Sequence, residues 1–380
     1  MRVKTAKRLE QFGETVFATW SRLAVEHNAI NLGQGFPDFE APDFVKEAAV
    51  QAIRDGENQY SRSAGHPKLV EAIADTFEIP VDPMDEVTVT CGSTETIAAA
   101  ILGLINPGDE VIVIEPFYDS YLACLSMAGA IPIIVTLHAP DFTLNEDELR
   151  SAFSDKTKMI IVNSPHNPTG RVFTRDELGL IAELAIQHDS IVLSDEVYDK
   201  LVLTGEHIPI ATLPEMRNRT ITLRSLGKVF SVTGWKIGWS VASPELTQGI
   251  RNAHQFLTFC AATPLQVAAA TALRATEDYF KTYTAEYRER RDLLVDGLLS
   301  VGFNVKPPEG TYFILADHTP FGFEDDVAFC HHLVKTCGVV GIPPTAFYSK
   351  SAEGRGLIRF AFCKGAETLK NAVERLRGLC

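Results

Sequence analysis

The sequence has none of the features that mark a membrane-spanning, secreted or nucleic-acid-binding protein. No apolar run approaches the length of a membrane span, and residues 1–14 are basic without an apolar stretch that would serve as a signal peptide. Basic residues are in deficit: 35 Lys and Arg face 49 Asp and Glu, and the resulting net charge of −14 repels phosphate backbones. We therefore expect neither a membrane nor a nucleic acid as a partner.

The cysteines do not form a pattern typical of disulfides or of a zinc site. There are 7 of them, an odd number, and no two are spaced as C-x-x-C. Cys330, His331 and His332 are adjacent, but neighbours on a helix cannot easily bind one ion and no second cluster completes a set of ligands. We expect reduced thiols, a cytoplasmic protein and no metal.

The middle of the chain alternates between short β-rich runs and helical patterns. Strands are expected at 86–91, 110–115, 131–136, 158–163, 190–194, 219–224 and 237–242. Helices are expected at 94–105, in a stretch ending at Ala128, and at 174–188, where Thr174 is the N-cap and Glu177 holds the capping-box position. Apolar strands that alternate with helices predict an α/β fold with a mostly parallel sheet covered on both faces. Ligands bind such sheets at the carboxyl ends of the strands.

The two ends of the chain lie outside this alternating pattern. A long helical stretch from about Pro264 to Ser300 is followed by shorter elements and a last helix after Gly365. We expect a large domain over residues 40–275. A smaller α+β domain over residues 276–380 would include the returning N-terminal segment 1–39.

Lys228 follows a predicted buried strand, in the turn Ser225-Leu-Gly-Lys228. Burial lowers the pKa of a lysine and turns its amine into a nucleophile for carbonyl groups, although a plain loop lysine is the simpler interpretation of this motif alone. Lys236 lies eight positions on and has the charge to bind a phosphate together with Ser225.

Asp195 lies at the end of another apolar strand, in Ser194-Asp-Glu-Val-Tyr198. A buried carboxylate needs a cation, and a protonated pyridine nitrogen would supply one. The alternative is that Asp195 caps a following helix. Tyr198 is close enough in sequence to face the same site.

Three further strand ends carry polar or aromatic residues. Asn167 belongs to a stiff loop of asparagines, prolines and glycine, which is either a donor site or a plain turn. Ser93 and Thr94 open a helix, where they cap it, bind an anion, or do both. Tyr118 offers a ring for stacking or for core packing.

Arg359 interrupts an otherwise apolar strand, Leu357-Ile-Arg-Phe-Ala-Phe362. Burial of a guanidinium costs free energy unless an anion pairs with it. Two N–H groups of the planar guanidinium can donate to the two oxygens of one carboxylate. The partner is either an internal acid or the carboxylate of a ligand.

Taken together, these motifs resemble the class I/II aminotransferases of fold type I, which depend on pyridoxal 5'-phosphate (PLP). Their order and spacing cover nearly the whole chain. Within that family, the segments Asn31-Leu-Gly-Gln-Gly-Phe-Pro-Asp-Phe39, Asn58-Gln-Tyr60 and Glu309-Gly-Thr-Tyr-Phe313 are similar to the kynurenine, glutamine–phenylpyruvate and methionine aminotransferase group.

The resemblance implies roles for individual residues. Lys228 would hold PLP covalently and move the substrate proton, and Asp195 would pair with the pyridine nitrogen. The residues implied in binding the rest of the cofactor are Ser93, Thr94, Tyr118, Asn167, Tyr198, Ser225, Lys236 and, from a partner subunit, Tyr60. Those implied in binding the substrate α-carboxylate are Gly35, Asn167 and Arg359. Many relatives have arginine where Lys236 stands. Lysine keeps the positive charge but lacks the planar guanidinium group of arginine.

The implied activity is transfer of the α-amino group of an amino acid to a 2-oxo acid by a homodimer whose active sites are shared across the interface. The alternative is a PLP-dependent β-lyase of the cysteine-conjugate type. Aromatic residues expected near the pocket favour methionine, aromatic amino acids or glutamine as donors: Phe17, Trp20, Phe36, Tyr60, Phe256 and Phe259. Arg22 and Arg62 are the nearby cations that would change this preference.

Overall fold

The computed structural model describes residues 5–349 and 352–379. The α-helices are α1 (Val16–Glu26), α2 (Asp43–Arg54), α3 (Pro67–Asp75), α4 (Ser93–Leu104), α5 (Ser120–Ala128), α6 (Glu146–Ala152), α7 (Arg175–Gln187), α8 (Leu226–Val229), α9 (Pro244–Leu257), α10 (Thr263–Leu273), α11 (Glu277–Val301), α12 (Asp326–His332) and α13 (Ala366–Leu376). The strands are β1 (Ile30–Asn31), β2 (Val87–Thr90), β3 (Glu110–Glu115), β4 (Ile131–Thr136), β5 (Thr157–Asn163), β6 (Ile191–Asp195), β7 (Thr220–Ser225), β8 (Gly238–Val241), β9 (Asn304–Val305), β10 (Phe313–Asp317), β11 (Val339–Val340) and β12 (Leu357–Ala361).

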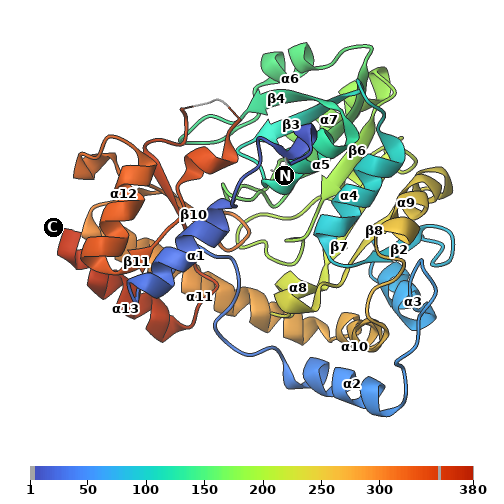
Figure 1. Cartoon of the computed structure of the whole chain (residues 1–380), viewed down its shortest axis with the longest axis horizontal. Helices are drawn as coiled ribbons and strands as arrows, with labels where there is room; N and C mark the ends of the chain where they lie inside the picture. The colour runs from blue at the N-terminus through green and yellow to red at the C-terminus, as the bar shows by residue number, and fades with distance from the viewer. Residues whose placement is uncertain (1–4, 350–351, 380) are drawn as a thin grey trace, which may run out of the picture.

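A seven-stranded sheet forms the centre of the larger part of the molecule, in the order β2-β8-β7-β6-β5-β3-β4 (Figure 1). Only the pairings of β8 with its two neighbours are antiparallel. The strands coincide with the seven predicted from sequence to within one residue at each end. The predicted α/β class with a mostly parallel sheet is therefore confirmed.

Helices cover both faces of this sheet because its strands are apolar on both faces. Alternate residues of β3 enter different cores: Val111 and Val113 pack on the side of α4 and α5, whereas Ile112 and Ile114 pack on the side of α7. The helix α7 begins as predicted, since Thr174 and Glu177 form a capping box.

Strand register brings the chemically interesting chain segments to one edge of the sheet. Asn163 pairs with Asp195 at the ends of β5 and β6. Gly238, at the start of the antiparallel strand β8, pairs with both Ser225 and Thr90 at the ends of their strands. The loops after β2, β5, β6 and β7 and the loop before β8 therefore meet at the same edge.

The smaller part of the molecule combines the two ends of the chain. Its antiparallel sheet has the order β12-β10-β9, and β1 pairs in parallel with β11. Figure 1 shows α1, near the N-terminus, lying among the C-terminal elements α12, α13 and β11. The N-terminal segment thus packs against residues more than 300 positions along the chain.

One sequence-based expectation about the helices is wrong. The long helix from Pro264 to Ser300 is divided into α10 and α11 by residues 274–276. Thr276 is extended, with φ −70° and ψ 157°, and Glu277 and Asp278 start the next helix, where acidic side chains interact favourably with the helix dipole. In the described part of the chain, no helix combines the length and apolarity required to cross a membrane.

Candidate active site

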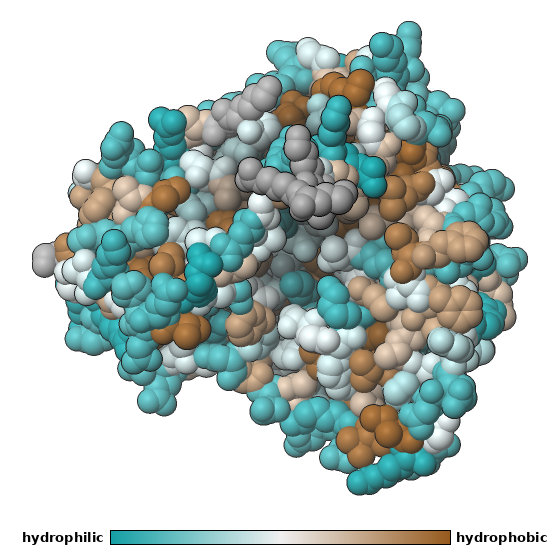
Figure 2. All heavy atoms as spheres, in the orientation of Figure 1, coloured by the Kyte–Doolittle hydropathy of each residue, from teal (hydrophilic) through white to brown (hydrophobic). Residues whose placement is uncertain are grey.

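A cavity of about 210 Å³ lies at the carboxyl edge of the large sheet. Figure 2 shows the molecular surface hollowed over the region in which Figure 1 draws α8. The predicted site residues that line this cavity are Ser93, Thr94, Tyr118, Asn167, Asp195, Tyr198, Ser225, Lys228 and Lys236. The structure therefore brings together residues from five separate segments of the chain.

Lys228 lies half-buried on the cavity wall, in the short helix α8 that follows β7. Burial lowers the pKa of its amine to about 8. The Tyr283 hydroxyl donates to the Lys228 carbonyl over 2.9 Å, which fixes the backbone at this point. The Lys228 amine lies 5.7 Å from the ring centres of both Tyr198 and Tyr312.

Asp195 is the last residue of β6 and is almost fully buried. Burial raises the pKa of its carboxyl to about 6, although the Tyr121 hydroxyl donates to Oδ2 over 2.6 Å and so favours the ionised form. No helix begins here, and the Val197 N–H donates to Oδ1 over 3.3 Å instead. The helix-cap alternative therefore does not explain Asp195.

The start of α4 forms a cradle with a positive charge beside it. Gly92 is the N-cap, with φ +76°, and a Cβ added there would lie 3.0 Å from the Lys236 Nζ. Lys236 itself has φ +54°, a left-handed conformation that is unfavourable for lysine. Neither Ser93 nor Thr94 caps the helix through its side chain, so the free N–H groups at this terminus face the cavity edge.

Ser225 stands on the other side of this cradle, at the N-cap of α8. Its hydroxyl accepts a hydrogen bond from the Gly227 N–H over 3.2 Å. Its own hydroxyl proton stays available to an anion on the cavity side.

Arg359 is buried and has no carboxylate partner in the described residues. One terminal nitrogen donates to the Asn167 Oδ1 over 3.1 Å and the other to the Gly33 carbonyl over 2.9 Å. Its Nε has no partner, and burial lowers the pKa of the guanidinium to about 10. The internal-acid alternative for Arg359 therefore finds no ion pair in residues 5–349 and 352–379.

Aromatic rings surround this guanidinium. Its carbon lies 4.1, 4.8 and 5.2 Å from the ring centres of Phe313, Phe347 and Phe17. These rings exclude water and contribute cation–π attraction. The charge of Arg359 is thus preserved at a desolvated position, where a carboxylate ligand binds strongly.

Besides Arg359, two further predicted site residues do not line the cavity, Gly35 and Tyr60. Gly35 accepts a hydrogen bond from the Tyr312 hydroxyl over 2.7 Å, and a Cβ there would come within 2.6 Å of the Phe313 ring, so only glycine fits. Tyr60 is 84% exposed and lines a shallow hollow with Cys260, away from the catalytic cavity of its own chain.

The expected aromatic wall is only partly formed within this chain. Phe17, an aromatic residue expected near the pocket, lies 5.2 Å from the Arg359 guanidinium, but Trp20 is buried against His331 at 4.9 Å between ring centres and belongs to the core. Phe256 is 86% exposed. The expectation for Trp20 is wrong because α1 turns this face of the helix toward the smaller part of the molecule.

The family model described as aminotransferase class I and II matches residues 27–376. The chain belongs to this aminotransferase family. It is 44% identical to a probable N-succinyldiaminopimelate aminotransferase, DapC, of Mycobacterium tuberculosis, over 98% of each chain. The solved structure of the M. tuberculosis enzyme superposes with a TM-score of 0.96, over 99% of this chain and 100% of that chain, at 44% identity.

Other similar proteins are also transaminases. A kynurenine–oxoglutarate transaminase of Dictyostelium discoideum is 40% identical over 98% of this chain and 96% of its own. A methionine aminotransferase of Escherichia coli is 38% identical over 98% and 97%. The fold type I resemblance and the aminotransferase activity are confirmed, and the lyase alternative is not favoured.

The aminotransferases of this family depend on PLP. The residues of this aminotransferase fit that cofactor. A lysine of lowered pKa, a buried carboxylate and a glycine-bordered anion cradle lie on one cavity, and Gly92 leaves open the volume that a Cβ would fill. These are the donors that an aldehyde, a pyridine nitrogen and a phosphate require.

Tyr121 was not identified from the sequence. It lies one helical turn after Tyr118, and its aromatic character alone is typical of core packing. Its contact with Asp195 arises because α5 passes over the end of β6, which the sequence pattern does not indicate.

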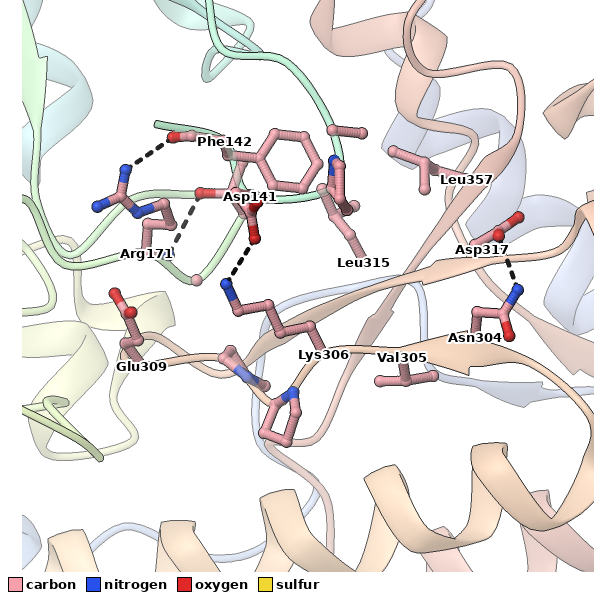
Figure 3. A pocket seen from close by; sticks show the side chains of 16 residues that line it. Asp141, Phe142, Arg171, Asn304, Val305, Lys306, Glu309, Leu315, Asp317 and Leu357 are labelled. Atoms are coloured by element: carbon pink, nitrogen blue, oxygen red, sulfur yellow. Dashed lines mark hydrogen bonds and ion pairs between the residues drawn. The ribbon is translucent and has the colours of Figure 1, made fainter. Parts of the chain in front are cut away.

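A larger cavity of this aminotransferase, about 450 Å³, lies where residues 139–142 and 169–171 meet residues 304–309 (Figure 3). Lys306 and Asp141 point toward one another across it, 2.9 Å apart. The other charged side chains that line it are hydrogen-bonded or paired: Arg171, Glu309 and Asp317. This cavity lacks the unpartnered groups found at the smaller one.

Proposed function

We propose that the chain transfers the α-amino group of a neutral amino acid to a 2-oxo acid, with PLP as cofactor. The observation that carries this proposal is Arg359, a buried guanidinium with a free Nε, two hydrogen bonds to neutral groups and no carboxylate partner in the described residues. An α-carboxylate supplies the missing charge, and both half-reactions use substrates that have one.

Different residues of the cavity would bind different parts of the cofactor. Lys228 would hold it covalently, Asp195 would pair with the pyridine nitrogen, and Tyr118 would stack on the ring. Tyr198 and Asn167 would bind the phenolic oxygen. The phosphate would bind to the cradle at the start of α4, that is to Ser93, Thr94, Ser225 and Lys236.

The chemistry that bound PLP supplies is an electron sink for the Cα–H bond of the substrate. The chain supplies the rest. Arg359, with Asn167 and the Gly35 backbone, fixes the α-carboxylate and so orients the Cα–H bond. The Lys228 amine, freed when the substrate amine replaces it, would take the proton from Cα and deliver it to the C4′ carbon of the cofactor, which its lowered pKa permits near neutral pH.

The charges around the site support a neutral donor side chain. Arg22 pairs with Glu14 at 3.0 Å, and Arg62 donates to the Met84 sulfur at 3.1 Å. Neither lines the catalytic cavity. Among the described residues, the cations that line this cavity are Lys228 and Lys236, which the proposal assigns to the cofactor, so a side-chain carboxylate loses hydration without compensation. Methionine, aromatic amino acids and glutamine are the proposed donors.

A second candidate substrate class follows from the similarity to the M. tuberculosis enzyme named for N-succinyldiaminopimelate. That compound has distal carboxylates as well as an amide. Its distal carboxylates would need a cation that the described contacts do not place at the cavity, such as Arg62 in another orientation. We therefore rank this substrate class second.

We propose a homodimer in which Tyr60 of the partner subunit completes the phosphate site. The exposed apolar residues Tyr60, Phe256, Leu257 and Phe259 support it, because such residues gather on a face that another protein covers. We also propose a cytoplasmic location, and large and small domains over residues 40–275 and over 1–39 with 276–380.

The test is a set of single-turnover half-reactions with one amino acid at a time, followed by the absorbance of the cofactor. Methionine, phenylalanine and glutamine should convert the enzyme faster than aspartate, with N-succinyldiaminopimelate included as the competing candidate. Conversion by aspartate or by N-succinyldiaminopimelate alone would reject the neutral-donor proposal. With a cysteine S-conjugate as substrate, pyruvate and ammonia formed without any oxo acid would indicate the lyase.

A further inference from the structure

Asp119 is an acidic residue at the edge of the site with no assigned role. It follows Tyr118 and precedes α5, yet its carboxylate makes no capping hydrogen bond to that helix. It lines an outer cavity of about 500 Å³ together with Phe17, Tyr118 and Ala346. Tyr118 also lines the catalytic cavity, so the two cavities share a wall.

The charge of Asp119 has no ion-pair partner among residues 5–349 and 352–379. Burial raises the pKa of its carboxyl, while the Ser120 N–H and the field of Arg359 lower it only in part. A half-buried carboxylate with unused acceptor positions is stabilised by any N–H group that reaches it.

Asp119 and Arg359 lie near each other, since the charge of Arg359 acts on the Asp119 carboxyl, and Phe17 is common to the surroundings of both. Phe17 lies over the Arg359 guanidinium at 5.2 Å and also lines the outer cavity. An amino acid bound to Arg359 through its α-carboxylate therefore extends its side chain along Phe17 and Tyr118 toward Asp119. This step rests on the proposed function of Arg359.

We propose that Asp119 is a specificity residue that accepts a hydrogen bond from an N–H donor at the far end of the donor side chain. The substrate class is α-amino acids with a distal amide or aromatic amine. A substrate with a distal carboxylate is rejected because its negative charge would face that of Asp119. A substrate side chain with neither a distal N–H donor nor a distal carboxylate is unaffected by Asp119.

Glutamine and glutamate test the proposal because they have nearly the same shape and differ in this one group. The variants are Asp119→Asn and Asp119→Ser. The control is Asp278→Asn, the same substitution at an exposed carboxylate of α11 that lines neither cavity. For each holoenzyme, kcat/KM is measured for glutamine, glutamate and methionine with one common oxo acid.

The ratio of kcat/KM for glutamine over glutamate should fall by at least about tenfold in both Asp119 variants, while methionine changes by less than about threefold. In Asp278→Asn the ratio should stay at the wild-type value. Equal losses for all three donors, or a ratio no different from that of the control, would overturn the proposal. If wild-type enzyme transaminates none of the three donors, the proposed function has failed rather than the role of Asp119.

Discussion

The Tyr121 hydroxyl lies 2.6 Å from the Asp195 Oδ2, and both groups are buried. Burial raises the pKa of Tyr121 well above its ordinary value, and the neighbouring Asp195 charge raises it further. The phenol therefore stays protonated and donates to the carboxylate. Through this bond α5 holds the end of β6 in the conformation that faces the cavity.

Removing this hydroxyl should change the pH dependence of the reaction. The hydrogen bond from Tyr121 stabilises ionised Asp195, so Tyr121→Phe should raise the pKa of Asp195 and move the acid limb of kcat/KM to higher pH. The matched control is Tyr348→Phe, which removes a buried hydroxyl that has no hydrogen-bond partner. An acid limb that is unchanged in Tyr121→Phe, or shifted equally in the control, would contradict the argument.

Replacement of the carboxylate itself should be far more damaging. Asp195→Asn retains the shape but removes the charge that keeps a pyridine nitrogen protonated. We expect PLP still to bind and the rate of proton abstraction to fall roughly a thousandfold, which is about 4 kcal/mol in the transition state. Single-turnover absorbance with a good donor measures it, and near-normal turnover would refute the role of Asp195.

Lys236 should matter only to a ligand with a phosphate. In Lys236→Met the Kd of PLP should rise by about tenfold to a hundredfold, as expected for loss of a charge-assisted hydrogen bond of about 1.5–3 kcal/mol. The Kd of pyridoxal, which lacks the phosphate, should stay unchanged. Fluorescence titration of the apoenzyme distinguishes the two, and parallel losses would mean that Lys236 supports the fold instead. The variant Lys236→Arg tests whether the guanidinium group that many relatives have at this position also supports PLP binding in this chain.

The sheet could be predicted from the sequence because each strand is a compact apolar run between polar turns. Most of the cavity residues could be predicted as a set because they follow these strands, and carboxyl ends of parallel strands meet at one edge. That reasoning holds even for Lys236, which precedes the antiparallel strand β8 and so reaches the same edge from the other direction.

What the sequence does not indicate depends on how helices dock. The contact between Tyr121 and Asp195 requires knowing which helix crosses β6, and the burial of Trp20 requires knowing that α1 packs beside β11. The break between α10 and α11 at residues 274–276 is not evident from the sequence, because the Ala, Leu and Arg residues just before Thr276 favour helix. In the proposed homodimer, the surroundings of Tyr60 would depend on the second chain.

The lowered pKa of Lys228 leads to a prediction about cofactor uptake by the apoenzyme. Only a neutral amine attacks an aldehyde, and burial lowers the pKa of Lys228 to about 8. The neutral fraction, and with it the rate of covalent PLP uptake, should therefore rise about tenfold between pH 6 and pH 7 and level off above about pH 8. A solvated lysine model amine, whose pKa is about 10.4, should still gain rate beyond pH 9. Stopped-flow absorbance at a series of pH values gives both curves, and Lys228→Arg should show no covalent uptake at any of them. A rate for the wild-type apoenzyme that keeps rising to pH 10 would show that Lys228 is solvated and would remove the physical basis for its activation.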